Sequence, residues 1–104
     1  MEPIYPLHEM ALATARALIA EHRGSHAESA ELFTDAAERW EKFEMPWMRA
    51  QSLLGQGRCL LALGRGAEAA PPLQTAREIF ESLGAKPALA ETDALLAKAL
   101  AATS

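Results

Sequence analysis

The sequence contains no valine and no asparagine, and only three of its 104 residues are isoleucine. Strands favour β-branched and aromatic residues, and aromatic residues make up only 6% of the chain. Alanine, the strongest helix former, occurs 23 times. This balance excludes an ordinary β-sheet protein and predicts an all-α fold.

Cysteine, long apolar runs and net positive charge are also scarce or absent, and each of these absences excludes some classes of protein. The single cysteine, Cys59, has no partner for an internal disulfide, which fits a reducing compartment. No apolar run is long enough to cross a bilayer, and residues 1–7 lack the basic start and apolar stretch of a signal peptide. The net charge of −4 disfavours nucleic acid, because phosphate binding needs a basic surface. We therefore expect a cytoplasmic protein that binds neither membrane nor nucleic acid directly.

Proline and glycine divide the chain at regular intervals. Glycine suits the position just after a helix, and proline suits the first helical turn. These residues predict five helices, over about 7–23, 26–44, 46–63, 67–83 and 87–102. Connections this short join antiparallel neighbours. The pair Pro71-Pro72 interrupts the fourth segment, so we expect that helix either to start near Pro71 or to have a distorted first turn.

The sequence resembles itself when it is aligned with a shifted copy of itself. The shift places Gly24 on Gly64 and Trp40 on Phe80. A fixed period equal to the spacing between Gly24 and Gly64 is typical of stacked helical repeats. Large side chains recur at helical spacing, which predicts a core that includes Phe33, Trp40, Phe43, Leu53, Leu60, Leu73, Phe80 and Leu83.

The second unit of this repeat carries a motif. It reads Leu53-x-x-Gln56-Gly57-x-x-Leu60, then Gly64, then Ala69-x-x-x-Leu73 and Ala76. The motif resembles the tetratricopeptide signature, although glutamine replaces the usual leucine and the period is longer than is usual for that repeat. The resemblance implies one domain over 1–104, built as a short right-handed solenoid of antiparallel helix pairs. Repeat 1 would span about 10–45, repeat 2 about 46–85, and a final packing helix about 87–102, giving two and a half repeats.

Three segments suggest a narrower family. They span 45–51, 57–65 and 76–85, and together they resemble the tetratricopeptide-like regions of large bacterial transcriptional regulators of the LuxR/MalT type and of class III nucleotide cyclase regulators. The resemblance implies a sensor or coupling arm in a signalling protein. On this reading the chain is a fragment of a longer regulator.

In tetratricopeptide arrays the first helix of each pair lines a concave groove. The resemblance therefore implies that residues aligned by the repeat lie side by side there, so that Arg58 lies next to Lys98. Two adjacent cations would suit an acidic group or a C-terminal carboxylate on an extended peptide. The alternative is that both are ordinary solvent-facing cations. The candidate groove residues are Gln51, Leu54, Arg58, Glu91, Lys98 and His22.

So short a solenoid is expected to leave an apolar face at each end, which favours self-association. The candidate interface residues are Leu12 and Ile19 on the first helix and Leu89, Leu95, Leu96 and Leu100 on the last. We expect a homodimer with a two-fold contact, the commonest symmetry among soluble oligomers.

No residue set supports catalysis. His22 and His26 flank a helix break, and two imidazoles alone are not a metal site. Cys59 lies among leucines, where nothing nearby would lower its pKa. We therefore expect no enzyme activity and no cofactor. The expected function is a protein-interaction or sensor module, and the alternative is a structural oligomerisation module without a separate ligand.

Overall fold

The computed structural model describes residues 6–102, and it describes side-chain surroundings for residues 11–101. Within 6–102 the chain forms helices and no strand, which confirms the all-α prediction. Five helices follow one another, and the bounds of each lie close to those predicted: α1 (Pro6–His22), α2 (His26–Lys42), α3 (Pro46–Ala62), α4 (Gly66–Leu83) and α5 (Lys86–Ala102).

The turns that follow the first four helices are alike. In each, a backbone N–H donates to the carbonyl of the fifth residue before it, as Arg65 does to Leu60 at 2.9 Å. The matching bonds start at residues 25, 45 and 85. The residue before each donor has a positive φ, which is 74° at Gly64, and glycine also fills this position at 24 and 84. Glu44, with φ 54°, is the exception. The same helix C-terminal turn, with a residue of positive φ, thus recurs after each of the first four helices.

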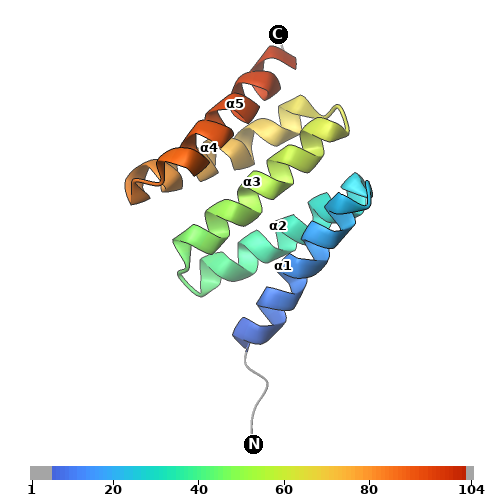
Figure 1. Ribbon diagram of the computed structural model, residues 1–104, viewed down its shortest axis with the longest axis vertical. Coiled ribbons are helices and arrows are strands. Elements are labelled where there is room, and N and C mark those ends of the chain that lie inside the picture. The colour runs from blue at the N-terminus through green and yellow to red at the C-terminus, as the bar shows by residue number, and fades with distance from the viewer. Residues whose placement is uncertain (1–5, 103–104) are drawn as a thin grey trace, which may run out of the picture.

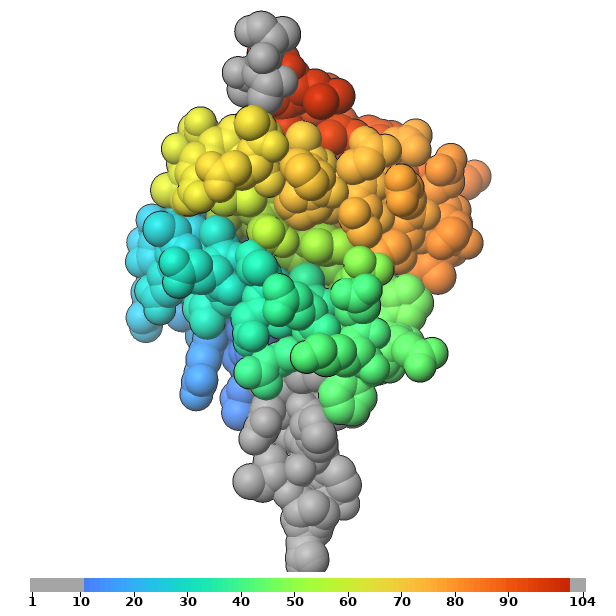
Figure 2. All heavy atoms as spheres, turned by 180° about the vertical axis from the view of Figure 1, so that it is seen from behind, coloured from blue at the N-terminus to red at the C-terminus, as the bar shows by residue number. Residues whose placement is uncertain are grey.

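The helices form two layers. Consecutive helices pack against each other throughout the described chain. Figure 1 shows α1, α3 and α5 side by side at the front, and Figure 2 shows α2 and α4 covering the opposite side. Segments that the repeat aligns with each other are therefore neighbours in the front layer, as the sequence predicts.

The core forms where helices cross. A Cβ added at Gly55 would lie 2.6 Å from the Phe33 ring, so glycine permits α2 and α3 to approach closely. Burial confirms five of the predicted core residues, which are Phe33, Trp40, Leu60, Leu73 and Phe80. Leu53 is half-buried.

The predicted burial of Phe43 and Leu83 is wrong. Their exposed fractions are 47% and 46%. Phe43 is the residue that caps the end of α2, and Leu83 is the last residue of α4. Both side chains lie at the ends of their helices, where a following helix no longer covers them. The repeat aligns these two residues correctly but does not indicate where helix contact stops.

The prolines of the fourth helix lie inside it. α4 begins at Gly66, so the prediction that it starts near Pro71 is wrong. Neither Pro71 nor Pro72 has an N–H to donate to the preceding turn, and α4 continues through both. Pro71 is exposed and Pro72 is half-buried, on a side of the helix that is not fully packed.

Candidate functional site

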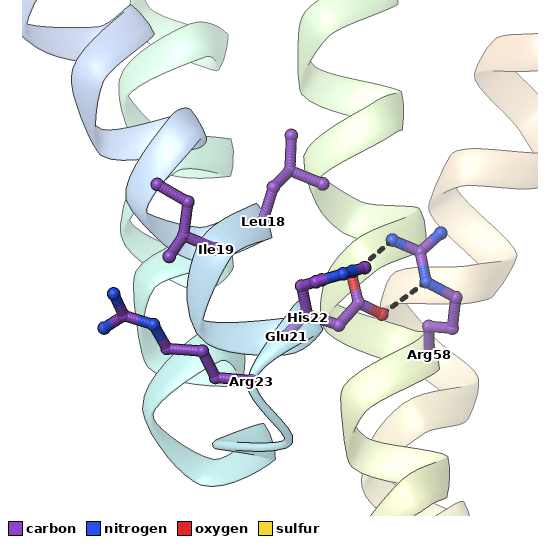
Figure 3. A pocket seen from close by; sticks show the side chains of 6 residues that line it. All are labelled: Leu18, Ile19, Glu21, His22, Arg23 and Arg58. Atoms are coloured by element: carbon purple, nitrogen blue, oxygen red, sulfur yellow. Dashed lines mark hydrogen bonds and ion pairs between the residues drawn. The ribbon is translucent and has the colours of Figure 1, made fainter.

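The layer of α1, α3 and α5 contains a charged cluster centred on Arg58 of α3. The Arg58 Nε and Nη2 atoms donate to the two carboxylate oxygens of Glu21 on α1, at 2.6 and 2.7 Å. Its Nη1 atom donates to Glu91 of α5 at 3.4 Å. Figure 3 shows the two-pronged contact between Arg58 and Glu21. One guanidinium thus links all three helices of this layer.

The geometry keeps the Arg58–Glu21 pair ionised. The hydrogen bond from Arg58 lowers the pKa of Glu21, and this effect exceeds the opposing effect of partial burial. The hydrogen bond to Glu21 likewise raises the pKa of Arg58. A guanidinium has five N–H groups, and three of those of Arg58 are used in the bonds to Glu21 and Glu91.

The predicted groove residues fall into two groups. His22, Glu91 and Lys98 are exposed, and Gln51 is half-buried in the same layer. Leu54 is 1% exposed and belongs to the core, so its side chain is closed to a ligand.

The two cations expected in the groove, Arg58 and Lys98, differ in their ion pairs. The charge of Arg58 is compensated by Glu21 and Glu91. Lys98, by contrast, forms no ion pair with any residue whose side chain the structure describes. The cationic character of the groove therefore lies at Lys98.

Sequence reasoning missed Glu21. The repeat places Leu18 opposite Arg58, and Glu21 lies one helical turn after Leu18 on the same face of α1. Glu21 can be found from the sequence by looking one helical turn beyond the residue that the repeat aligns with Arg58.

A hollow of about 710 Å³ surrounds the C-terminal turns of α1 beside this cluster. It is lined by Leu18, Ile19, Glu21, His22, Arg23 and Arg58 (Figure 3). Its volume falls in the range of ligand sites, and it is an open depression.

The repeat architecture has a counterpart among known families. The sequence profile of the tetratricopeptide repeat matches residues 9–82, which is more than half of the chain. The chain belongs to the tetratricopeptide repeat family. Repeats of this family are scaffolds that mediate protein–protein interaction. No curated protein and no solved structure matches the chain.

Two polar side chains buried in this tetratricopeptide stack hold helices together. Ser29 of α2 donates to the carbonyl of Ala17 at 2.6 Å, and the Cys59 thiol donates to Ser29 Oγ at 3.3 Å. Burial raises the pKa of Cys59, so its sulfur stays protonated and is a poor nucleophile.

Two further findings concern metal and membrane sites. Among the described residues, no group of three or more His, Cys, Asp or Glu side chains could hold a metal ion. No helix within 6–102 combines the length and apolar character needed to cross a membrane.

The two end faces of the stack differ in what they expose. On α1, Leu12 and Ile19 are 52% and 50% exposed. On α5, Leu100 is 54% exposed, whereas Leu96 is buried at 8% and packs in the core. Leu89 and Leu95 are partly buried against the same core. The leucines of α5 thus mostly serve its own packing, and the exposed apolar surface is larger on α1.

Proposed function

We propose that the face formed by α1, α3 and α5 binds an extended segment of a partner protein. The observation that carries the proposal is the fixed guanidinium of Arg58, which Glu21 holds at two atoms. A donor fixed in advance loses little entropy when a ligand binds. Backbone carbonyl oxygens of an extended peptide are suitable acceptors.

The charge distribution suggests which peptide fits. Because Glu21 and Glu91 offset Arg58, this part of the groove favours neutral main-chain groups over a carboxylate. Lys98 follows on α5 without an ion pair among described residues. We propose that an acidic side chain or the terminal carboxylate of the peptide lies near Lys98, while the adjoining backbone contacts Arg58.

The cellular role that we propose is that of a coupling or sensor module in a bacterial transcriptional regulator of the cytoplasm. Its support is the resemblance of segments 45–51, 57–65 and 76–85 to such regulators. In this role, binding of a partner segment to the groove would stabilise one arrangement of the helix stack over another.

The groove proposal is tested by peptide selection. A display library of random peptides is panned on the immobilised chain, and enriched peptides are titrated in solution. Arg58→Met, which keeps much of the aliphatic side chain and removes the donors, should weaken binding about tenfold, the effect of losing one or two charge-assisted bonds. Lys98→Ala should weaken it by a similar factor. The control is Lys42→Ala, an exposed cation on α2. Equal losses in all three variants, or none, would contradict a site in this groove.

A second candidate function is self-association, for which we propose a two-fold contact through the end face at α5. Its support is the exposure of Leu100. Sedimentation at several concentrations tests it. Dimer that persists in Leu100→Ser would rule out this end face, and a monomer at all concentrations would rule out the candidate.

A further inference from the structure

The repeat shows which face of α1 is left uncovered by the helices within 6–102. On α3, the residues at 52, 55 and 59 face α2: Cys59 bonds Ser29, and Gly55 lies against Phe33. Ser52 and Cys59 are at most 1% exposed. At the equivalent positions of α5, Thr92 and Ala99 are 0% exposed beneath α4. In both cases a preceding helix buries this face completely.

The equivalent face of α1 is exposed. The repeat aligns Ser52 and Cys59 with Leu12 and Ile19, which are larger and apolar, and which are about half exposed. Figure 3 shows Ile19 and Arg23 on the side of α1 away from Arg58, although both residues also border the hollow beside Arg58. A second hollow, of about 470 Å³, borders it and is lined in part by Arg16, Ile19, Arg23, Glu28 and Leu32.

The charge on this face selects the kind of helix that fits it. Arg16 follows Leu12 by one helical turn, and Arg23 follows Ile19 by the same spacing. Neither arginine forms an ion pair with a described residue. The residue equivalent to Arg16 on α3 is Gln56, which shares a hollow with Glu31 of α2. A helix seated on α1 as α2 sits on α3 would bring its counterpart of Glu31 to Arg16.

We infer that the surface formed by Leu12, Arg16 and Ile19 of α1 and by Arg23 in the turn after it, here called the α1 edge, docks an acidic amphipathic helix of a partner protein. The helix adds the missing layer, with apolar residues on Leu12 and Ile19 and carboxylates at Arg16 and Arg23. This binding surface faces away from Arg58 and adjoins the proposed groove at Ile19 and Arg23.

Charge also argues against a second copy as the occupant. A two-fold contact between two α1 edges would gather four guanidinium groups, two from each copy, at one interface, where each copy supplies one bordering carboxylate, Glu28. Like charges brought together at an interface are costly.

The α1 edge also sets the size of the side chain that meets it. The residue equivalent to Gly55 is Ala15, and a Cβ at Gly55 would lie 2.6 Å from Phe33. The docked helix therefore needs a residue smaller than phenylalanine at the position of Phe33.

The chain supplies its own acidic probe. The probe is a peptide of residues 25–45, which contains the α2 sequence. The substitution Phe33→Leu in the peptide provides the smaller side chain that Ala15 requires. A lactam between the side chains of Glu38 and Lys42, both exposed in α2, keeps the peptide helical. Fluorescence anisotropy of this peptide is measured against the full chain. Binding should weaken about tenfold in Ile19→Asp, which removes a half-exposed apolar anchor, and about fivefold in Arg16→Glu.

Two comparisons make the result specific. Leu100→Asp, a matched change at a similarly exposed residue of the other end face, should leave binding unchanged. A peptide with Glu31→Arg should bind the Arg16→Glu chain better than the wild-type chain. The inference is overturned if the peptide does not bind, if Leu100→Asp weakens binding as much as Ile19→Asp, or if the Glu31→Arg peptide shows no reversed preference. It is also overturned if Ile19→Asp abolishes a self-association seen in sedimentation, since the occupant is then a second copy.

Discussion

Replacing Glu44 by glycine should stabilise the protein. Glu44 has a φ of 54°, in the left-handed region that glycine occupies at 24, 64 and 84. A non-glycine residue in that region costs roughly 1–2 kcal/mol. The Glu44 side chain is exposed and has no hydrogen bond or ion pair with a described residue, so its removal sacrifices no contact.

The reverse change at the equivalent position gives the matched measurement. A Cβ added at Gly64, where φ is 74°, would meet nothing within 4 Å, so Gly64→Ala changes backbone strain without a steric clash. We expect Glu44→Gly to raise the free energy of unfolding by about 1 kcal/mol, and Gly64→Ala to lower it by about the same amount.

Thermal unfolding followed by circular dichroism is the assay. For a domain of this size, about 1 kcal/mol corresponds to a shift of roughly 4–8 °C in Tm. The control is Glu44→Ala, which removes the carboxylate but keeps the strained backbone, and which should leave Tm nearly unchanged. If Glu44→Ala stabilised the chain as much as Glu44→Gly, the gain would come from charge, and the argument from backbone conformation would be wrong.

Three other perturbations follow from the packing and the charges. Trp40→Ala should cost about 3–5 kcal/mol in chemical denaturation, because the side chain is 3% exposed; a loss below about 1 kcal/mol would contradict its place in the core. Gly55→Ala should destabilise by about 1 kcal/mol, since overpacking against Phe33 outweighs the better helix propensity of alanine, and a stabilised variant would show that the ring moves aside freely. Because Arg58 lowers the pKa of folded Glu21, the pair stabilises the fold above the unfolded pKa of about 4.5 and loses this effect as pH falls through the folded value. The stability difference between wild type and Glu21→Gln should therefore be present at neutral pH and vanish in acid, and a difference that persists in acid would refute the assignment.

The sequence predicts the course of the backbone well because one turn recurs. Gly24, Gly64 and Gly84 mark three of the four turns, and Pro46 begins the helix after the remaining one. Glycine and proline act through the local backbone, so their effect is visible without tertiary information. Glu44 shows the limit of this reasoning, because nothing in its side chain indicates a left-handed conformation.

The candidate site is less predictable because it depends on contacts between helices. The repeat aligns Arg58 with Leu18 and Lys98, but the ion pair forms with Glu21, one helical turn further along α1. The same alignment predicts that Leu54 lies in the groove, but its side chain is buried in the core. The repeat alignment shows which residues occupy equivalent positions on neighbouring helices. It does not show how each helix is rotated about its axis, and this rotation decides which of the equivalent side chains are exposed.

The proposed groove is tested most directly by mapping a bound peptide. A peptide enriched by display selection is titrated into the isotope-labelled chain, and amide nitrogen–proton NMR signals are followed through the titration. The account predicts that the largest changes fall on the exposed side of α1, α3 and α5, around Arg58 and Lys98, and that the outer surfaces of α2 and α4 stay unchanged. Changes confined to α2 and α4 would contradict the assignment of the α1, α3 and α5 face as the protein-binding surface.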